Sequence, residues 1–477
     1  MTDAIVFNGI DADTGTYALP AMSAIGLATI AAQTEFDPQH LKELKWRSQQ
    51  LANPHYAPIE GVDPKDLAQS GWGVIFAHNA EPAIRDALKP LLDLRRAQAS
   101  KIKEARYREF TGPDGFWSPD ETKPDFLDRH GAGGGGAVDP DQLPYYLLIA
   151  GSPEAIPFSF QYQLDVQYAV GRLHFDHIED YARYAQSVVD AESGNVTQAK
   201  RAAFFGVANP DDQATTMSAG DLVAPLAQWI AADQPSWKIE TVDSGNATKA
   251  GLAQFLGGSQ TPALLFTASH GMCFQNGDAR QIAGQGALLC QDWPGPQEWK
   301  QAIPPGFYFG GDDLASDAQL RGMIAFHFAC FGGGTPQQDD FVAVGADKPK
   351  TIAARPFIGH LPQRLLSHPK GGALAAIAHV DRAWGYSFKS KRDTQLRVFQ
   401  STLKRLMEGH PVGSALEYFN NRYSELASDL VTMLRGIKLG KTADEYALSS
   451  LWTCSNDARN YVVLGDPAVR LPVSATR

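Results

Sequence analysis

Short apolar runs alternate with amphipathic segments through most of the chain. Runs of this kind predict buried strands, and helical spacing of apolar residues predicts the helices between them. Strands that alternate with helices pair in parallel, so the pattern predicts an α/β fold with a doubly wound, mostly parallel sheet sandwiched by helices. From residue 201 onward the expected order is a strand at 202–207, a helix at 217–232, a strand at 237–242, a helix at 249–256 and a strand in the run 264–271.

The pattern also divides the chain. Residues 1–60 have weak periodicity and are expected to be an N-terminal lead-in or prosegment. Residues 61–195 contain strand candidates at 73–77 and 145–150 and a long charged helix over 82–110, which predicts a smaller, non-catalytic α/β subdomain. The remainder, 196–477, is expected to be the catalytic domain, with two long helices at 393–408 and 412–434 and a last strand at 461–471.

Two apolar runs end on a reactive side chain near glycine. Leu264–Gly271 reads LLFTASHG and delivers His270, and Met323–Gly334 reads MIAFHFACFGGG and delivers Cys330. In open α/β sheets ligands bind where strands end, so two neighbouring strands would bring an imidazole beside a thiol. That pairing suits a cysteine nucleophile with a histidine base. Either residue alone would more simply be a buried structural side chain, but the paired pattern favours catalysis.

The same runs supply backbone donors. The N–H groups of Gly271 and Cys330 are candidates for an oxyanion hole, in which the loss of one donor typically costs ~3 kcal/mol. Residues 272–321 form a long excursion rich in Gly, Pro and Asp, and such a loop beside a site is usually functional. Cys273, which follows His270 closely, is either a redox partner or a bystander.

Composition narrows the classes of function. The 477 residues are 44% hydrophobic and 20% charged with a net charge of −11, which allows an ordinary core and argues against nucleic acid or an anionic membrane as partner. The four cysteines form no CxxC pair, so neither a disulfide framework nor a zinc knuckle is expected. His174 and His177 have metal-compatible spacing but no third ligand cluster, so no metal or other cofactor is expected. No apolar run reaches membrane length and the start lacks a positively charged signal region, so we expect a cytoplasmic protein.

A family resemblance rests on five motifs in order. FTASHG followed by FHFACFGGG resembles the catalytic His and Cys strands of the caspase-like (clan CD) cysteine peptidases, which include caspases, gingipains, separase and CHAT-domain proteases. The gingipain-like and CHAT branches fit best. YYLLIAGSPEAIPF with DVQYAVGRL resembles the first subdomain of gingipain-type peptidases, AAIAHVDRAW their strand after the nucleophile, and LGDPAVRL their closing motif. The resemblance spans residues 145–471.

The resemblance implies a caspase-like fold and a role for each matched residue. Cys330 would be the nucleophile and His270 the general acid and base. The Gly271 and Cys330 amides would form the oxyanion hole. Asp381 and Trp384 would line the substrate cleft.

In this family the loop after the first catalytic-domain strand often reads the substrate side chain. Here that loop is Asn209–Asp221, and it contains Asp211, Asp212 and Asp221. An acidic pocket residue would favour cleavage after Arg or Lys, although turn formation and helix N-terminal charge also explain these residues. Gingipains orient the histidine with a Glu near the end of that strand. This chain has Val-Ala-Asn at 207–209, so the orienting group is unidentified and a Cys-His dyad is expected.

These observations predict a cytoplasmic cysteine endopeptidase that acts on protein or peptide substrates without a cofactor. As a zymogen it would be controlled by an activating protease or a regulatory partner. Gly332–Lys350 is either an activation loop, with Lys348, Lys350 and Arg355 as candidate processing points, or an ordinary mobile loop. Bacterial relatives suggest, by analogy only, a part in defence or programmed death. The alternatives are a catalytically silent caspase-like scaffold and another Cys-His acyl-transfer enzyme, such as an amidase or transferase.

Overall fold

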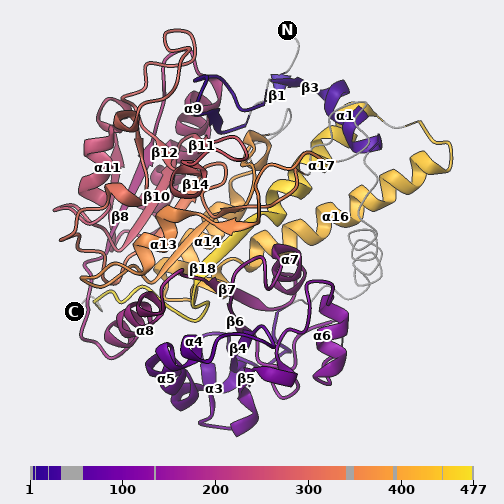
Figure 1. The fold of residues 1–477 in the computed structure, drawn as a ribbon, viewed down its shortest axis with the longest axis vertical. Coiled ribbons are helices and arrows are strands. Elements are labelled where there is room, and N and C mark those ends of the chain that lie inside the picture. The colour runs from indigo at the N-terminus through magenta and orange to yellow at the C-terminus, as the bar shows by residue number, and fades with distance from the viewer. Residues whose placement is uncertain are drawn as a thin grey trace.

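The protein is built around one large sheet. The computed structural model describes residues 4–5, 7–19, 21–33, 57–133, 136–339, 349–389, 395–442 and 444–474. Ten strands pair in the order β5-β4-β6-β7-β18-β17-β14-β10-β8-β9 (Figure 1). Every neighbouring pair is parallel except β17 and β18, so the mostly parallel α/β fold is confirmed. The strands are β4 (Trp72–Phe76), β5 (Tyr107–Phe110), β6 (Tyr146–Ala150), β7 (Ala169–Leu173), β8 (Arg201–Gly206), β9 (Lys238–Val242), β10 (Leu264–Ala268), β14 (Ile324–Phe328), β17 (Ala375–His379) and β18 (Tyr461–Gly465).

The single antiparallel pair divides the sheet into two blocks of opposite direction. β18 comes last in the sequence, yet it pairs in parallel with β7 on one side and antiparallel with β17 on the other. The block of β5, β4, β6 and β7 comes from residues 72–173, and the block from β17 to β9 comes from residues 201–379. A strand from the far end of the sequence therefore joins the two blocks.

Helices flank the sheet. Phe399 and Phe419, on two of them, pack against sheet residues Phe326 and Tyr461, with ring centroids of Phe326 and Phe399 6.0 Å apart and those of Phe419 and Tyr461 4.2 Å apart. The longer helices are α1 (Ala24–Gln33), α5 (Lys89–Ala99), α7 (Phe158–Asp165), α8 (Ile178–Glu192), α10 (Ala224–Asp233), α14 (Arg397–Met407), α16 (Glu417–Lys438) and α17 (Glu445–Arg459). The shorter ones are α3 (Leu67–Ser70), α4 (Pro82–Ala87), α6 (Lys123–Arg129), α9 (Gln213–Met217), α11 (Lys249–Phe255), α12 (Gln281–Gly284), α13 (His360–Leu366) and α15 (Val412–Ala415). None of the helices in the described part of the chain is long and apolar enough to cross a membrane.

Two expected helices differ from the structure. The continuous helix predicted over 82–110 is wrong, because α4 ends at Ala87, α5 begins with a proline in its first turn, and Tyr107–Phe110 forms the edge strand β5. Proline has no N–H to donate and so starts a helix more readily than it continues one. The helix predicted at 217–232 is α9, a π-helical turn at Ser218–Val223 and α10 in succession.

The excursion after β10 forms a second, smaller sheet with the N-terminal segment. Its order is β13-β12-β11-β2, from Tyr308–Phe309, Leu288–Leu289, Gly271–Cys273 and Gly9–Asp11. β2 pairs in parallel with β11, and Gly9 lies opposite Gly271. Ile10 is fully buried in a small core with residues of the excursion. The indigo N-terminal segment consequently lies at the same end of the molecule as β11 and α9 (Figure 1).

The closing motif after β18 contacts residues of the first block of strands and of a helix that follows β4. Asp466, directly after β18, is fully buried and accepts hydrogen bonds from Arg95 Nε at 2.7 Å and Trp72 Nε1 at 2.9 Å. Burial alone would lower the pKa of Arg95, but the charges and hydrogen bonds of Asp466 and Glu192 together outweigh burial and raise it. A buried charge is stable only when it is paired, so this ion pair is a joint between segments more than 350 residues apart.

Candidate active site

His270 and Cys330 follow the carboxyl ends of two neighbouring strands of the sheet. β10 and β14 are parallel neighbours whose last paired residues are Ala268 and Phe328, and each reactive residue lies two positions further on. Both side chains are fully buried. A side chain on Gly271 would come within 1.8 Å of the carbonyl oxygen of Cys330, so the close approach of the two strand ends requires glycine there.

An aspartate orients the histidine. Asp212 Oδ2 lies 2.7 Å from His270 Nε2, and both side chains are fully buried. Asp212 follows β8, which pairs with β10 on the side opposite β14, and its carboxylate caps the N-terminus of α9. The hydroxyl groups of Tyr17 and Thr215 also donate to it. The structure therefore differs from two expectations: an acidic side chain contacts His270, where no such group was identified, and the Asp212 carboxylate is occupied by hydrogen bonds from protein groups.

The charge of Asp212 determines which ring nitrogen of His270 donates to it. Burial alone would raise the pKa of Asp212, but His270 and the donated hydrogen bonds outweigh burial and hold that pKa below its usual range. An ionised carboxylate only accepts hydrogen bonds, so His270 must donate from Nε2. Nδ1 lies on the other side of the ring, and among the described residues it has no hydrogen-bond partner. Nδ1 is therefore the ring atom left to exchange a proton with a reacting group.

Two backbone N–H groups converge on one oxygen. The amides of Gly271 and Cys330 both donate to the carbonyl oxygen of Asn8, at 2.9 Å and 3.2 Å. Donors in this arrangement stabilise the negative charge that develops on a carbonyl oxygen under nucleophilic attack. The Cys330 thiol accepts a hydrogen bond from the Ala383 N–H at 3.3 Å. Burial nevertheless raises the pKa of this thiol well above its ordinary value, which keeps it protonated while it is covered.

Backbone strain is concentrated around the same residues. Phe331, Asp381 and Asp211 are the described non-glycine residues with positive φ, at 59°, 70° and 53°. Phe331 follows Cys330 directly, and its N–H donates to the carbonyl oxygen of Asp381 at 2.6 Å. Asp211 directly precedes Asp212. Such conformations persist only where the surrounding structure enforces them, and they cluster at functional sites.

Of the other residues predicted to bind substrate, Trp384 and Asp381 are buried, whereas Asp211 and Asp221 are not. Trp384 is buried against Phe7, with ring centroids 5.6 Å apart. Asp381 is buried and lies 3.0 Å from Arg382. By contrast, Asp211 is exposed on its turn, and Asp221 is paired with Lys389.

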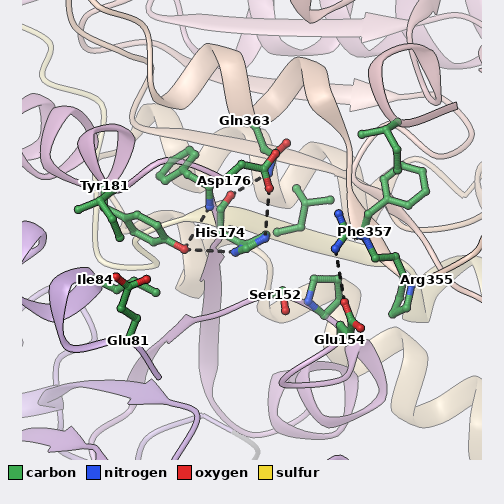
Figure 2. A pocket seen from close by; sticks show the side chains of 16 residues that line it. Glu81, Ile84, Ser152, Glu154, His174, Asp176, Tyr181, Arg355, Phe357 and Gln363 are labelled. Atoms are coloured by element: carbon green, nitrogen blue, oxygen red, sulfur yellow. Dashed lines mark hydrogen bonds and ion pairs between the residues drawn. The ribbon is translucent and has the colours of Figure 1, made fainter. Parts of the chain in front are cut away.

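Two of the three predicted processing points lie in the described part of the chain. Lys350 and Arg355 are exposed, and Lys348 is outside the described residues. Arg355 borders a cavity of ≈ 320 Å³ that also includes Glu154, 3.7 Å from Arg355, and His174 (Figure 2). His174 lies 3.2 Å from the Tyr181 hydroxyl. The described residues contain no group of three or more His, Cys, Asp or Glu side chains that could hold a metal ion, here or elsewhere.

Comparison with known proteins gives little beyond this geometry. No family model matches the chain, and no curated protein matches it significantly. A solved structure described as a protease is similar over 85% of this chain and 80% of its own, with 11% identity and a TM-score of 0.47. A chain of the Saccharomyces cerevisiae separase-securin complex is similar over 68% of this chain and 16% of its own, with 9% identity and a TM-score of 0.30. These values are low, so the functional proposal depends on the site itself.

Proposed function

We propose that this protein is a caspase-like cysteine endopeptidase with Cys330 as nucleophile, His270 as general acid and base, and Asp212 as the group that orients His270. One observation carries the proposal: beside the end of β14, where Cys330 lies, the amides of Gly271 and Cys330 both donate to the carbonyl oxygen of Asn8. Such convergence has a direct use in acyl transfer, where it stabilises an oxyanion.

The reaction follows from these positions. His270 Nδ1 accepts the thiol proton, and Cys330 Sγ attacks the carbonyl carbon to form a tetrahedral oxyanion held by the two amides. The carbon–nitrogen bond breaks as the imidazolium returns the proton to the leaving amine, which leaves a thioester on Cys330. Water, deprotonated by His270, then hydrolyses the thioester to a carboxylic acid and restores the thiol. Asp212 stabilises the imidazolium and keeps the ring in the productive orientation.

The preference for Arg or Lys before the cleaved bond is not part of this proposal. It depended on the carboxylates of Asp211, Asp212 and Asp221. Asp212 holds His270, and Asp221 is paired with Lys389. Asp211 lies exposed on the turn that precedes Asp212.

Covalent labelling tests the nucleophile. A peptide acyloxymethyl ketone should label the wild-type protein but not Cys330→Ala. The control Cys273→Ser, which removes a half-buried cysteine near the site, should be labelled like wild type. His270→Ala should slow labelling by roughly 100-fold or more, because general acid–base catalysis contributes about that factor. Cleavage of a peptide library by wild type, and not by Cys330→Ala, would establish endopeptidase activity.

The covered thiol also supports a second candidate, a silent caspase-like scaffold. Cys330 and His270 are both fully buried, as they would be in a protein that never turns over substrate. The two candidates differ in one result. If wild type and Cys330→Ala are labelled equally and neither cleaves any peptide after limited proteolysis or segment release, the protein is a scaffold.

A further inference from the structure

The N-terminal segment Phe7–Gly9 crosses the proposed cleft as an extended peptide. Phe7 forms an antiparallel bridge with Trp384, and the Asn8 N–H donates to the carbonyl oxygen of Ala383 at 3.1 Å. The Asn8 carbonyl oxygen receives the two amides of the proposed oxyanion hole. A protease binds its substrate in this way, by main-chain pairing on one side of the bond and oxyanion donors at its carbonyl.

The thiol borders the peptide bond that follows Asn8. The position that a side-chain carbon on Gly9 would occupy is 3.3 Å from Cys330 Sγ, so the thiol lies on the side of Gly9 where a side chain would be. Beyond Gly9 the chain continues as β2 along β11, and the Gly9 carbonyl accepts a hydrogen bond from Ala18 N–H at 3.1 Å. The Asn8–Gly9 bond thus lies where the reaction needs the scissile bond, with chain held on both sides of it.

The side chain of Asn8 indicates which residue the site accepts before that bond. It is fully buried, and Nδ2 donates to the Ser269 carbonyl oxygen at 3.2 Å. Aspartate here would turn a carboxylate oxygen against that carbonyl, and burying an unpaired charge is costly. A lysine or arginine would need a carboxylate partner, and Asp212 is already bound to His270. An uncharged amide adds no net charge to this enclosed position and donates to the Ser269 carbonyl, while its Oδ1 has no hydrogen-bond partner among the described residues.

We propose that Phe7–Gly9 is the enzyme's own substrate: the protein cleaves its Asn8–Gly9 bond, and asparagine is the residue it selects before the cleaved bond in other polypeptides. This inference rests on the proposed function. Cys330 Sγ bonds to the Asn8 carbonyl carbon, the bond to the Gly9 nitrogen breaks, and Gly9 leaves as an amine with the proton from His270. Water hydrolyses the thioester, so residues 1–8 end in a carboxylate and Cys330 regains its proton.

Cleavage would open the cleft on one side only. After cleavage residues 1–8 would be held by the short pairing of β1 (Ala4–Ile5) with β3 (Met22–Ser23) and by the docking of Phe7, and their departure would uncover Trp384, the Ala383 carbonyl and the two oxyanion donors. β2 would remain beside β11, because the paired residues Gly9–Asp11 and the buried Ile10 lie after the cleaved bond. Until then, burial keeps the pKa of the Cys330 thiol raised, in keeping with a latent enzyme.

Intact-mass measurement on the full chain tests the self-cleavage. Wild type should lose residues 1–8 and gain an N-terminus at Gly9, in a first-order reaction whose rate does not depend on protein concentration. Cys330→Ala should stay intact, and so should Asn8→Gln, whose amide is one methylene too long for a fully enclosed site. Asn8→Asp should be cleaved at least tenfold more slowly than wild type. Intact wild type alongside active enzyme, or Cys330-dependent cleavage at another bond, would overturn the inference.

A reporter cleaved in trans separates this inference from the proposed function. Phe7→Asp places a charge against Trp384 and should undock the segment without touching the catalytic groups. An intramolecular segment acts at an effective concentration of about 1 mM, so a segment with a Ki of roughly 10 µM would suppress trans activity about 100-fold. Phe7→Asp should therefore cleave Val-Phe-Asn-coumarylamide about 100-fold faster than wild type that has not yet cleaved itself. Phe7→Asp that also carries Cys330→Ala should not cleave this reporter. Cys330-dependent cleavage of a peptide library after a residue other than Asn refutes the inference and keeps the protease, whereas no Cys330-dependent cleavage by folded Phe7→Asp refutes both.

Discussion

Replacement of Asp212 by asparagine tests the catalytic arrangement most directly. One carboxylate oxygen of Asp212 faces His270 Nε2 at 2.7 Å, and both carboxylate oxygens accept from several donors. In Asp212→Asn one of these oxygens becomes an NH2 group. If the NH2 faces His270, the ring must put its proton on Nδ1 and can no longer act as a base there. If it faces Tyr17, that hydroxyl can rotate, but the imidazolium loses its countercharge. Both outcomes slow the reaction, and a wrong tautomer alone costs roughly 10⁴-fold in a serine protease triad.

We expect a 10²–10⁴-fold fall in kcat, equivalent to about 3–5 kcal/mol of barrier, with KM nearly unchanged. The assay is cleavage of the asparaginyl reporter in the Phe7→Asp background, together with the rate of self-cleavage in the otherwise native chain. Fold should be preserved, because Asn caps a helix about as well as Asp, and thermal unfolding would check this. Asp211→Asn, one residue away on an exposed turn, is the matched control and should keep its kcat. If Asp212→Asn keeps kcat within threefold while Cys330→Ala abolishes cleavage, the aspartate does not assist His270 and the site works as a dyad.

Three other changes probe the site and the fold. Gly271→Ala should lower reporter cleavage by roughly 100-fold or more, because the methyl group would collide with the Cys330 carbonyl and displace one oxyanion donor; retained activity would contradict that geometry. Asp466→Asn should reduce the free energy of urea unfolding by about 1.5–3 kcal/mol, since it leaves the buried Arg95 with Glu192 as its remaining counterion, and a loss under 1 kcal/mol would show that Asp466 does not join these segments. Burial lowers the pKa of His327 to about 4, against ~6.5 in the unfolded chain. As pH falls, the imidazole is therefore protonated in the unfolded chain first, and the free energy of unfolding decreases below pH ~6.5. Between pH 7 and pH 5 this amounts to about 2 kcal/mol, which urea unfolding of His327→Gln should lack; an unchanged pH dependence would show that another group is responsible.

The sequence was sufficient for the part of the site that depends on strand ends. Apolar runs gave β10 and β14, and parallel pairing of equal-length strands puts residues at the same offset side by side. His270, Cys330 and Gly271 lie together for that reason. The same logic could have found Asp212, because β8 also pairs with β10 and its following loop must lie at the same edge. The loop was identified, but composition alone does not tell a carboxylate that faces a histidine from one that faces a substrate.

The N-terminal segment could not be predicted in the same way. Phe7, Asn8 and Tyr17 lie in a stretch with weak periodicity, and their roles depend on pairing with residues more than 190 positions away. Nothing local in such a stretch favours one partner over another. The edge strand β5 was missed for a related reason, since its residues follow a charged helix and only pairing with β4 makes them a strand.

The position of β18 in the sheet sets the order in which the protein can fold. Until residues 461–465 have left the ribosome, β7 and β17 have no neighbour at the seam, and the two blocks of strands cannot become one sheet. Pairing between segments so distant in sequence is slow to form, because the chain must close very long loops first. A nascent chain would therefore already contain His270 and Cys330 while the seam beside them was open. Synthesis of β18 would come before the full assembly of the sheet that carries His270 and Cys330, so the proposed activity could not begin on a chain that lacks this strand.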